Sequence, residues 1–266
     1  MIIKQKAFYS HKKNRMKSEG DVLKAREYFF SKKNKNLYYL LKERFSWINN
    51  YINPHDNCLE LGSGSGFLKY FLNNENVKTS DLANYDFLDY KNIDALDTKF
   101  PDSTFHKVIT SNVIHHIGYP LKHFFEVYRI LKPNGLYIIQ DINCSVATQL
   151  AVILMRHEGF NFTVDPTNEN IPCNNPEDLW SANIALPNLI FDNFEKFNKK
   201  MDNRFTLVHQ NFSEFLTFLN SGGVIAKTKY IPLNKFFNKI IMKLDKLLVK
   251  FPKIFAMQRS IVLKKN

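Results

Sequence analysis

The first candidate site is a cluster of glycines between a predicted strand and a predicted helix. Only nine glycines occur in the chain, and three of them, Gly62, Gly64 and Gly66, fall within five residues. Glycine tolerates positive φ and lets a ligand approach the backbone closely. At a strand-to-helix turn this pattern is typical of a nucleotide site at the carboxyl edge of a sheet, although a plain tight turn would also favour glycine.

Three acidic side chains accompany this loop. Glu60 stands two residues before Gly62, Asp81 closes the next predicted strand, and Asp94 begins a segment that leads into the third. In dinucleotide folds, an acidic residue at about the distance of Asp81 meets the ribose hydroxyls. The dinucleotide fingerprint is G-x-G-x-x-G, whereas Gly66 comes one residue early here. A nicotinamide dehydrogenase is therefore disfavoured.

Three motifs of this chain resemble those of one enzyme family. The loop from Glu60 to Gly66 (E-L-G-S-G-S-G) matches the E-x-G-x-G-x-G loop of class I S-adenosylmethionine-dependent methyltransferases of type 11. The segment 94–105 is similar to their D-A-x-x-L-P-F-P-D-x-S-F stretch, and residues 131–135 (L-K-P-N-G) are similar to their L-K-P-G-G turn. Order and spacing agree over roughly residues 45–145. Lys99, His106 and Asn134 depart from the family pattern, and none of them removes an implied cofactor contact.

The resemblance implies S-adenosylmethionine as cofactor and S-adenosylhomocysteine as product. It places the amino-acid end of the cofactor on the glycine loop, which Glu60 helps to fix. It implies that Asp81 accepts hydrogen bonds from the ribose hydroxyls and that Asp94 accepts one from the adenine amino group. The implied cofactor-binding residues are Glu60, Gly62, Ser63, Gly64, Asp81, Leu82, Asp94, Ala95 and Asn112.

The implied chemistry is an in-line displacement, in which alignment of the reacting groups supplies much of the rate. A hydroxyl acceptor would also need a general base. His115 and His116 follow the predicted strand 107–111 and are the candidate catalytic residues, although one of the pair is expected to be structural. Asp141, His157 and Glu158 are candidates for contact with the acceptor, and His157 could equally be a solvated surface residue.

The sequence predicts neither a metal site nor a disulfide framework. His115, His116 and His123 lack a carboxylate pair nearby in the sequence, so their spacing is a weak metal signal. The three cysteines have no close spacing, which is typical of a chain kept in a reducing cytoplasm. They are Cys58, Cys144 and Cys173.

Alternating strands and helices must position these residues. The residue pattern predicts strands at 58–61, 77–80, 107–111, 136–140, 205–212 and 259–265, and helices at 21–52, 67–72, 121–131 and 233–251. Such alternation implies βαβ units and a mainly parallel sheet. Together with the resemblance, it predicts an α/β, Rossmann-like, doubly wound sheet of seven strands. The last strand would be antiparallel, N-terminal helices would precede the sheet, and an insertion would precede its last two strands.

The predicted organisation is an N-terminal arm with helices over 1–52 and a methyltransferase domain over 53–266, in which 144–204 shapes the acceptor pocket. Residues 180–187 (W-S-A-N-I-A-L-P) and 221–224 (S-G-G-V) resemble a bacterial branch linked with surface-polysaccharide assembly. The preferred acceptor is therefore a hydroxyl of a saccharide or lipid-linked saccharide. A quinone-like or other small metabolite is the alternative, and a non-catalytic binding or scaffold protein on this fold is the alternative of a different class.

The net charge of +12 is concentrated at the two ends of the chain. Residues 1–44 carry +9, residues 227–266 carry +10, and the middle carries −7. The segment 233–251 alternates a broad apolar stripe with lysines, which favours a helix packed on the globule and leaves contact with an anionic membrane as the alternative. Nucleic acid is disfavoured, because no RNA-binding module appears. Without a membrane-spanning run or a signal-type start, we expect a cytoplasmic protein, with contact at the inner face of the membrane as a further option.

Overall fold

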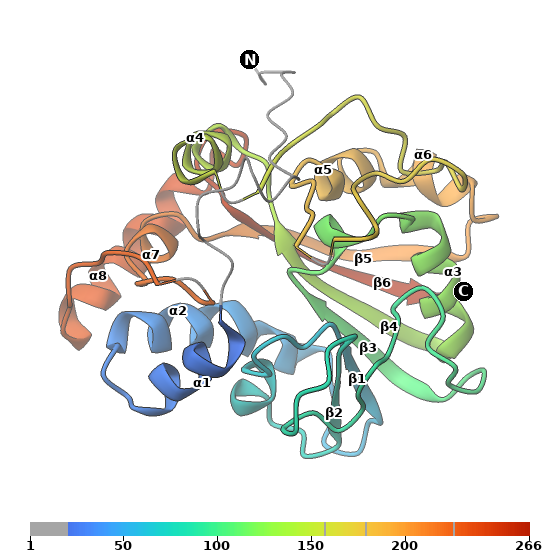
Figure 1. Ribbon diagram of the computed structural model, residues 1–266, viewed down its shortest axis with the longest axis horizontal. Coiled ribbons are helices and arrows are strands. Elements are labelled where there is room, and N and C mark those ends of the chain that lie inside the picture. Colours follow the sequence, from blue (N-terminus) through green and yellow to red (C-terminus); the bar gives the residue numbers. More distant parts are fainter. Residues whose placement is uncertain (1–20, 157, 179, 226) are drawn as a thin grey trace.

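The computed structural model describes residues 21–156, 158–178, 180–225 and 227–266, and a six-stranded sheet forms its centre (Figure 1). The strands lie in the order β2 (Val77–Ser80), β1 (Cys58–Leu61), β3 (Phe105–Ser111), β4 (Leu131–Ile142), β6 (Gln258–Lys265) and β5 (Phe205–Ser213). The pairs among the first four strands are parallel, whereas β6 is antiparallel to both of its neighbours. The predicted reversal of the last strand is confirmed.

The prediction of seven strands is wrong for the described residues, which form six. Beside β2, where another strand could pair, one parallel bridge joins Ser80 and Tyr90. The carboxylate of Asp89 accepts hydrogen bonds from the backbone N–H and the hydroxyl of Thr79, both at 2.9 Å. A side chain therefore satisfies some of the hydrogen-bond donors at this edge of the sheet. The segment between β2 and β3 continues in turns.

Helices cover both faces of the sheet, as expected for a doubly wound fold. One face carries α3 (Pro120–Ile130), α5 (Leu186–Phe191) and α6 (Phe194–Lys199), and the other carries α2 (Lys35–Ser46) with the short 3₁₀ helices η1 (Trp47–Asn50) and η2 (Leu68–Phe71). Side chains that alternate along a strand separate into these two cores. In β4, Tyr137 and Ile139 pack toward α3, whereas Ile138 packs toward α2.

The predicted helical segment 21–52 is interrupted. It forms α1 (Val22–Phe30), α2 and η1, with a break at residues 31–34. Lys32 adopts a left-handed φ of 57°, and the side chain of Asn34 accepts a hydrogen bond from the N–H of Leu37. A left-handed residue followed by a capping asparagine ends one helix and begins the next.

The helix α8 (Lys235–Leu248) packs on the globule through its polar face. Its buried residues are Asn238 and Asp245, and the Asp245 carboxylate accepts backbone N–H groups at the start of α7 (Leu216–Leu219). Large apolar residues of this segment are exposed, namely Phe236, Phe237, Ile240, Leu244, Leu247 and Phe251. The expectation that this stripe packs inward is therefore wrong for these residues.

The remaining elements connect the sheet to its surroundings. The 3₁₀ helix η3 (Ile114–His116) follows β3, and α4 (Val146–Met155) follows β4. The N–H groups of Val146 and Ala147 donate to the carbonyls of Lys253 and Ile254, so α4 begins against the segment after α8. Among the described residues, each helix is too short or too polar to cross a bilayer.

Candidate functional site

A cavity of about 510 Å³ lies where β1, β2 and β3 end at their carboxyl edge. Its lining includes every residue that the sequence motifs predict to contact the cofactor. These are Glu60, Gly62, Ser63, Gly64, Asp81, Leu82, Asp94, Ala95 and Asn112. Parallel strands bring their carboxyl ends to one edge, so residues spread over more than fifty positions of sequence meet at one site.

The glycine loop turns tightly over the end of β1. Gly62 and Gly64 have φ of 70° and 50°, in the left-handed region that favours glycine. A Cβ at Gly62 would lie 2.6 Å from Cγ2 of Val113, whereas a Cβ at Gly64 would meet no heavy atom of the described residues within 4 Å. The loop is therefore packed from below at Gly62 and open to the cavity at Gly64.

Glu60 places a buried carboxyl group beneath this loop. Only 2% of the residue is exposed, and its Oε2 has no hydrogen-bond partner among the described residues. Burial raises the pKa of this carboxyl to about 8, although a hydrogen bond from Ser63 opposes the shift, and the charge of Asp81 adds to it. A buried oxygen without a partner in a cavity wall suits a ligand that brings a positive charge or a donor.

Asp81 and Asp94, which also line the cavity, stabilise the turns that follow β2. Asp81 accepts hydrogen bonds from the N–H groups of Gly64 and Ala83, at 2.8 and 2.9 Å. Asp94 accepts from the N–H of Leu96 at 2.8 Å. A carboxylate offers about four acceptor positions, so both side chains can receive further hydroxyl or amino donors.

Asn112 lies at the end of β3 in a left-handed conformation, with φ of 56°. Its N–H donates to the carbonyl of Gln140 at 2.7 Å, and its side-chain oxygen accepts from Gln258 at 2.9 Å. These bonds hold the side chain toward β6. A ligand contact through the backbone of Asn112, as the family resemblance implies, agrees with this arrangement.

The N-terminal helices and the 144–204 segment add residues that motif reasoning missed. Val22, Arg44 and Phe45 line the cavity from α1 and α2. Arg26 donates to the carbonyl of Ser65, and its guanidinium lies 3.8 Å from the centre of the Phe87 ring. The other segment contributes Asn175, Pro176, Asp178 and Trp180. Trp180 begins the motif 180–187 in the segment expected to shape the acceptor pocket. No motif marks the others, because only the tertiary fold brings them to the glycine loop.

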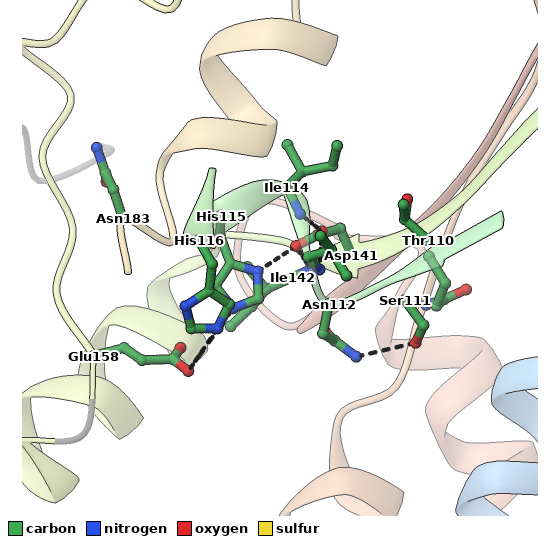
Figure 2. Close-up of polar contacts among 12 residues, drawn as sticks. Thr110, Ser111, Asn112, Ile114, His115, His116, Asp141, Ile142, Glu158 and Asn183 are labelled. Carbon is green, nitrogen blue, oxygen red and sulfur yellow. Dashed lines mark hydrogen bonds and ion pairs between the residues drawn. The ribbon is translucent and has the colours of Figure 1, made fainter. Parts of the chain in front are cut away.

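The two candidate catalytic histidines occupy different environments (Figure 2). Asp141 is fully buried, accepts backbone N–H groups from Val113 and Ile114, and lies 2.6 Å from Nδ1 of His115. Neither Asp141 nor His115 belongs to the cavity lining, whereas His116 does. The position of Asp141 favours a structural role rather than the predicted contact with the acceptor.

Glu158 completes this cluster. Its Oε1 lies 3.8 Å from Nε2 of His115 and 4.0 Å from Nε2 of His116. Burial alone would lower the pKa of His115, but the carboxylates of Asp141 and Glu158 outweigh it and raise that pKa to about 10. Burial and the adjacent charge of His115 lower the pKa of His116 to about 4. His157, also predicted as an acceptor contact, lies outside the described residues.

The comparisons with known proteins identify one domain. Residues 59–139 match a family model described as a methyltransferase domain. No curated protein matches the sequence. Solved structures with similar folds include the MccD protein (18% identity, 83% of this chain and 95% of that one, TM-score 0.46). One S-adenosylmethionine-dependent methyltransferase, from Archaeoglobus fulgidus, is 16% identical over 85% of this chain and 93% of that one, with a TM-score of 0.46. Another, from Mesorhizobium loti, is 11% identical over 82% of this chain and 96% of that one, with a TM-score of 0.44.

The residues present in the cavity fit the cofactor that this family uses. The unpartnered oxygen of Glu60 suits the ammonium group of S-adenosylmethionine, and the open space at Gly64 admits its close approach. The carboxylate of Asp81 retains acceptor positions for ribose hydroxyls. The chain therefore carries, over residues 59–139, a methyltransferase domain of the class that uses S-adenosylmethionine as methyl donor.

Proposed function

We propose that this enzyme methylates a hydroxyl group of a saccharide or lipid-linked saccharide. The observation that carries the proposal is the lining contributed by the 144–204 segment, where Asn175, Asp178 and Trp180 reach the cavity that holds the glycine loop. Amide and carboxylate groups hydrogen-bond sugar hydroxyls, and an indole ring packs against the apolar face of a sugar. A quinone-like or other small metabolite is the alternative acceptor, which the mostly apolar remainder of the lining would suit.

One group of residues would bind and orient the cofactor, and His116 would accept a proton. Bound S-adenosylmethionine supplies an electrophilic methyl group on its sulfonium. The glycine loop, Glu60 and Asp81 orient the reacting centre, and the helices α1 and α2 shield it from water. The Nδ1 of His116 faces the carbonyl of Ser181 at 3.0 Å and must donate to it, so Nε2 carries the lone pair. That atom accepts the proton of the hydroxyl as its oxygen attacks.

Calorimetry with S-adenosylmethionine tests the cofactor site and separates an enzyme from a scaffold protein. Asp81→Ala should weaken binding at least about tenfold, because it removes the carboxylate that orders Gly64 and faces the ribose position. Asp86→Asn is the matched control, since Asp86 is exposed on the same loop and pairs with Lys91. Absent binding, or equal affinities for Asp81→Ala and the wild type, would contradict the assignment.

Asparagine substitutions test the role of the histidines. His116→Asn and His115→Asn should lower turnover and leave the affinity for S-adenosylmethionine unchanged, because neither side chain holds the cofactor in this scheme. His209→Asn is the control, as His209 stacks on Trp47 outside the cavity lining. If both variants retain wild-type turnover, the histidines do not take part in the reaction.

Identification of a co-purifying ligand by mass spectrometry tests the acceptor class. A glycan or glycolipid, methylated by the enzyme in a labelled-methyl assay, would support the preferred acceptor. Trp180→Ala should then raise KM for that acceptor more than it lowers kcat, because the ring would position the sugar. Turnover with quinone-like substrates and none with saccharides would favour the alternative.

We further propose that α8 rests on the inner, anionic face of the cytoplasmic membrane, where a lipid-linked acceptor would be presented. Its exposed apolar residues include Phe236, Phe237 and Leu247, and exposed lysines at 235, 239, 243, 246 and 250 accompany them. Leu150 and Leu154 on α4 are also exposed, and α4 begins beside the segment that follows α8. Apolar insertion with flanking lysines is complementary to anionic lipid, and each lysine near the surface adds about 1 kcal/mol.

Vesicle sedimentation tests this contact. The protein should sediment with vesicles that contain phosphatidylglycerol and much less with vesicles of phosphatidylcholine alone, and added salt should weaken the binding. The double variant Phe236→Ser/Phe237→Ser should lose it, whereas Leu23→Ser should not, because Leu23 is an exposed leucine on α1. Equal sedimentation with both kinds of vesicle, or none with either, would refute the proposal.

A further inference from the structure

Two imidazole rings and a carboxylate face one another beside the cavity (Figure 2). They belong to His115 and His116 on η3 and to Glu158, which follows α4 far along the chain. One ligand atom from each of these residues can be chosen so that all three lie within 4.8 Å of one another. The sequence predicts no metal site, because the histidines lack a carboxylate pair nearby in the sequence. Folding supplies one carboxylate.

The Nδ1 atom of each imidazole ring lies within hydrogen-bond distance of an acceptor. Nδ1 of His115 bonds the carboxylate of Asp141, which also accepts the N–H groups of Val113 and Ile114 and is thereby fixed. Nδ1 of His116 bonds the carbonyl of Ser181. Metal-ligating histidines generally donate their second N–H to a carboxylate or a backbone carbonyl, which fixes the tautomer and directs the other nitrogen at the metal. Both kinds of partner are present here.

The spacing of the three groups is close to that of a coordination shell. Nitrogen and oxygen ligands lie about 2.0–2.2 Å from zinc, so two ligands of a tetrahedral ion are about 3.4 Å apart. The observed separations between Oε1 of Glu158 and the two Nε2 atoms are 3.8 and 4.0 Å. A contraction of about 0.5 Å, within reach of a glutamate side chain, would bring Oε1 of Glu158 to coordination spacing from both Nε2 atoms.

We propose that His115 and His116, through their Nε2 atoms, and Glu158 bind a divalent transition-metal ion. Two imidazoles with one carboxylate is a ligand set of catalytic zinc and of non-haem iron(II), and it leaves coordination positions for a substrate. His116 lines the cavity, so the ion would lie at its wall.

The role of the ion rests on the proposed function. There it would act as a Lewis acid that lowers the pKa of the coordinated hydroxyl, whose proton then passes to water. Nε2 of His116 would hold the ion instead of accepting that proton. Metal binding itself does not depend on which acceptor the enzyme uses, and the test below measures it without turnover.

The test is titration of metal-free, tag-free protein with Zn²⁺, followed by a competing chromophoric chelator, and with Co²⁺, followed by its visible absorption. One equivalent should bind. Glu158→Gln and His116→Ala should each weaken binding at least about tenfold. Glu177→Gln is the control, since it removes one exposed carboxylate of the same segment. X-ray absorption of the zinc form should show two imidazole ligands.

Binding far from one equivalent, or equal affinities for the wild type and for both variants once each is shown to be folded by circular dichroism, would overturn the site. Calorimetry with S-adenosylmethionine on the same samples separates the two proposals. Loss of metal binding with intact cofactor binding removes only the metal site, and the reverse result removes only the proposed function.

Discussion

Glu60 shows how the site depends on single groups. Its carboxyl is buried beneath the glycine loop with one oxygen unpartnered among the described residues, and its pKa is raised to about 8. Near neutral pH the carboxyl is therefore largely protonated when no ligand is bound. An arriving ammonium group would favour the ionised form, so cofactor binding should release a proton from this residue.

Glu60 should also impose a pH dependence on stability. The folded pKa of about 8 exceeds the ordinary value of 4.5, so the folded state holds the proton more tightly between these values. Stability should therefore fall as pH rises from about 5 to 8, by a few kcal/mol at most. Glu60→Gln should remove this part of the decline. Urea unfolding of both ligand-free proteins across this range checks it, and parallel curves for the two would contradict it.

The two loop glycines should respond differently to alanine. Gly62→Ala brings a Cβ to 2.6 Å from Val113 and should destabilise the fold by about 1–3 kcal/mol. Gly64→Ala incurs mainly the left-handed strain, about 1–2 kcal/mol, but its methyl group extends into the open space above the loop. Gly64→Ala should therefore lose more cofactor affinity for a given loss of stability. Thermal unfolding combined with calorimetry compares the two, and a reversed ranking would contradict the loop geometry.

The motif residues could be predicted from sequence because short loops fix their positions. Glu60, Gly62 and Gly64 lie within five residues, and Asp81 follows a strand that pairs directly with β1. Arg44 could not be predicted, since it reaches the cavity through packing between distant segments. Trp180 lies in the segment expected to shape the pocket, but the sequence did not mark it as a lining residue. The proximity of Glu158 to His116 also arises from packing between segments distant in the sequence, so it could not be predicted either. Periodicity carries no information about which loops meet above a sheet edge.

At the scale of elements, a buried ion pair joins α2 to the chain that follows β5. Arg44 donates to both carboxylate oxygens of Glu214, at 2.8 and 2.6 Å, and both side chains are almost fully buried. Arg44 also lines the cavity. The pair therefore fixes an N-terminal helix over the cofactor site from the far end of the sheet.

Removing one partner should be costly. Arg44→Met leaves the Glu214 carboxylate buried without its cation and should destabilise the protein by about 3–5 kcal/mol. Glu43→Gln, one residue away, breaks an exposed pair with Lys246 and should cost less than about 1 kcal/mol. Chemical denaturation measures both values. A similar, small loss in the two variants would mean that the buried pair contributes little.

Elements were predicted well where the apolar pattern is strict and poorly where it is mixed. The strand 58–61 lies where it was expected, because all four of its residues are buried. The strand 77–80 also lies where it was expected, although Lys78 within it is exposed. The seventh strand came from family resemblance, and the turn-rich segment before β3 forms two isolated bridges instead, Ser80–Tyr90 and Asp94–Asp97. The orientation of α8 was mistaken because Asn238 and Asp245 dock the helix through hydrogen bonds, which hydropathy cannot register.

At the scale of the whole molecule, acidic and basic side chains occupy different parts of the chain. The acidic middle of the chain forms the strands and loops of the cofactor site, whereas the basic C-terminal region carries α8. The excess positive charge of this region therefore lies outside the acidic middle that forms the cofactor site. A protein arranged in this way can turn one face to an anionic surface while its cavity receives the cofactor.

Cofactor binding should stabilise the entire fold. The cavity is lined from α1, α2, β1, β3 and the 144–204 segment, so a ligand there joins parts distant in sequence. A hundredfold excess over Kd should add about 2.7 kcal/mol and raise the unfolding midpoint by several degrees. Differential scanning calorimetry at increasing S-adenosylmethionine should show this rise, and Asp81→Ala should shift it to higher concentrations. A midpoint independent of the ligand would contradict the site.

The strand order has a consequence for how the chain is made. β5 joins the sheet only through β6, which is synthesised later and inserts between β4 and β5. Until residues 258–265 leave the ribosome, the edge of β4 stays bare and β5 has no partner in the sheet. Bare edges are templates for pairing between chains. The nascent protein is thus exposed to pairing between chains until residues 258–265 have emerged and paired with β4, and a chaperone that shields β4 would have most effect before then.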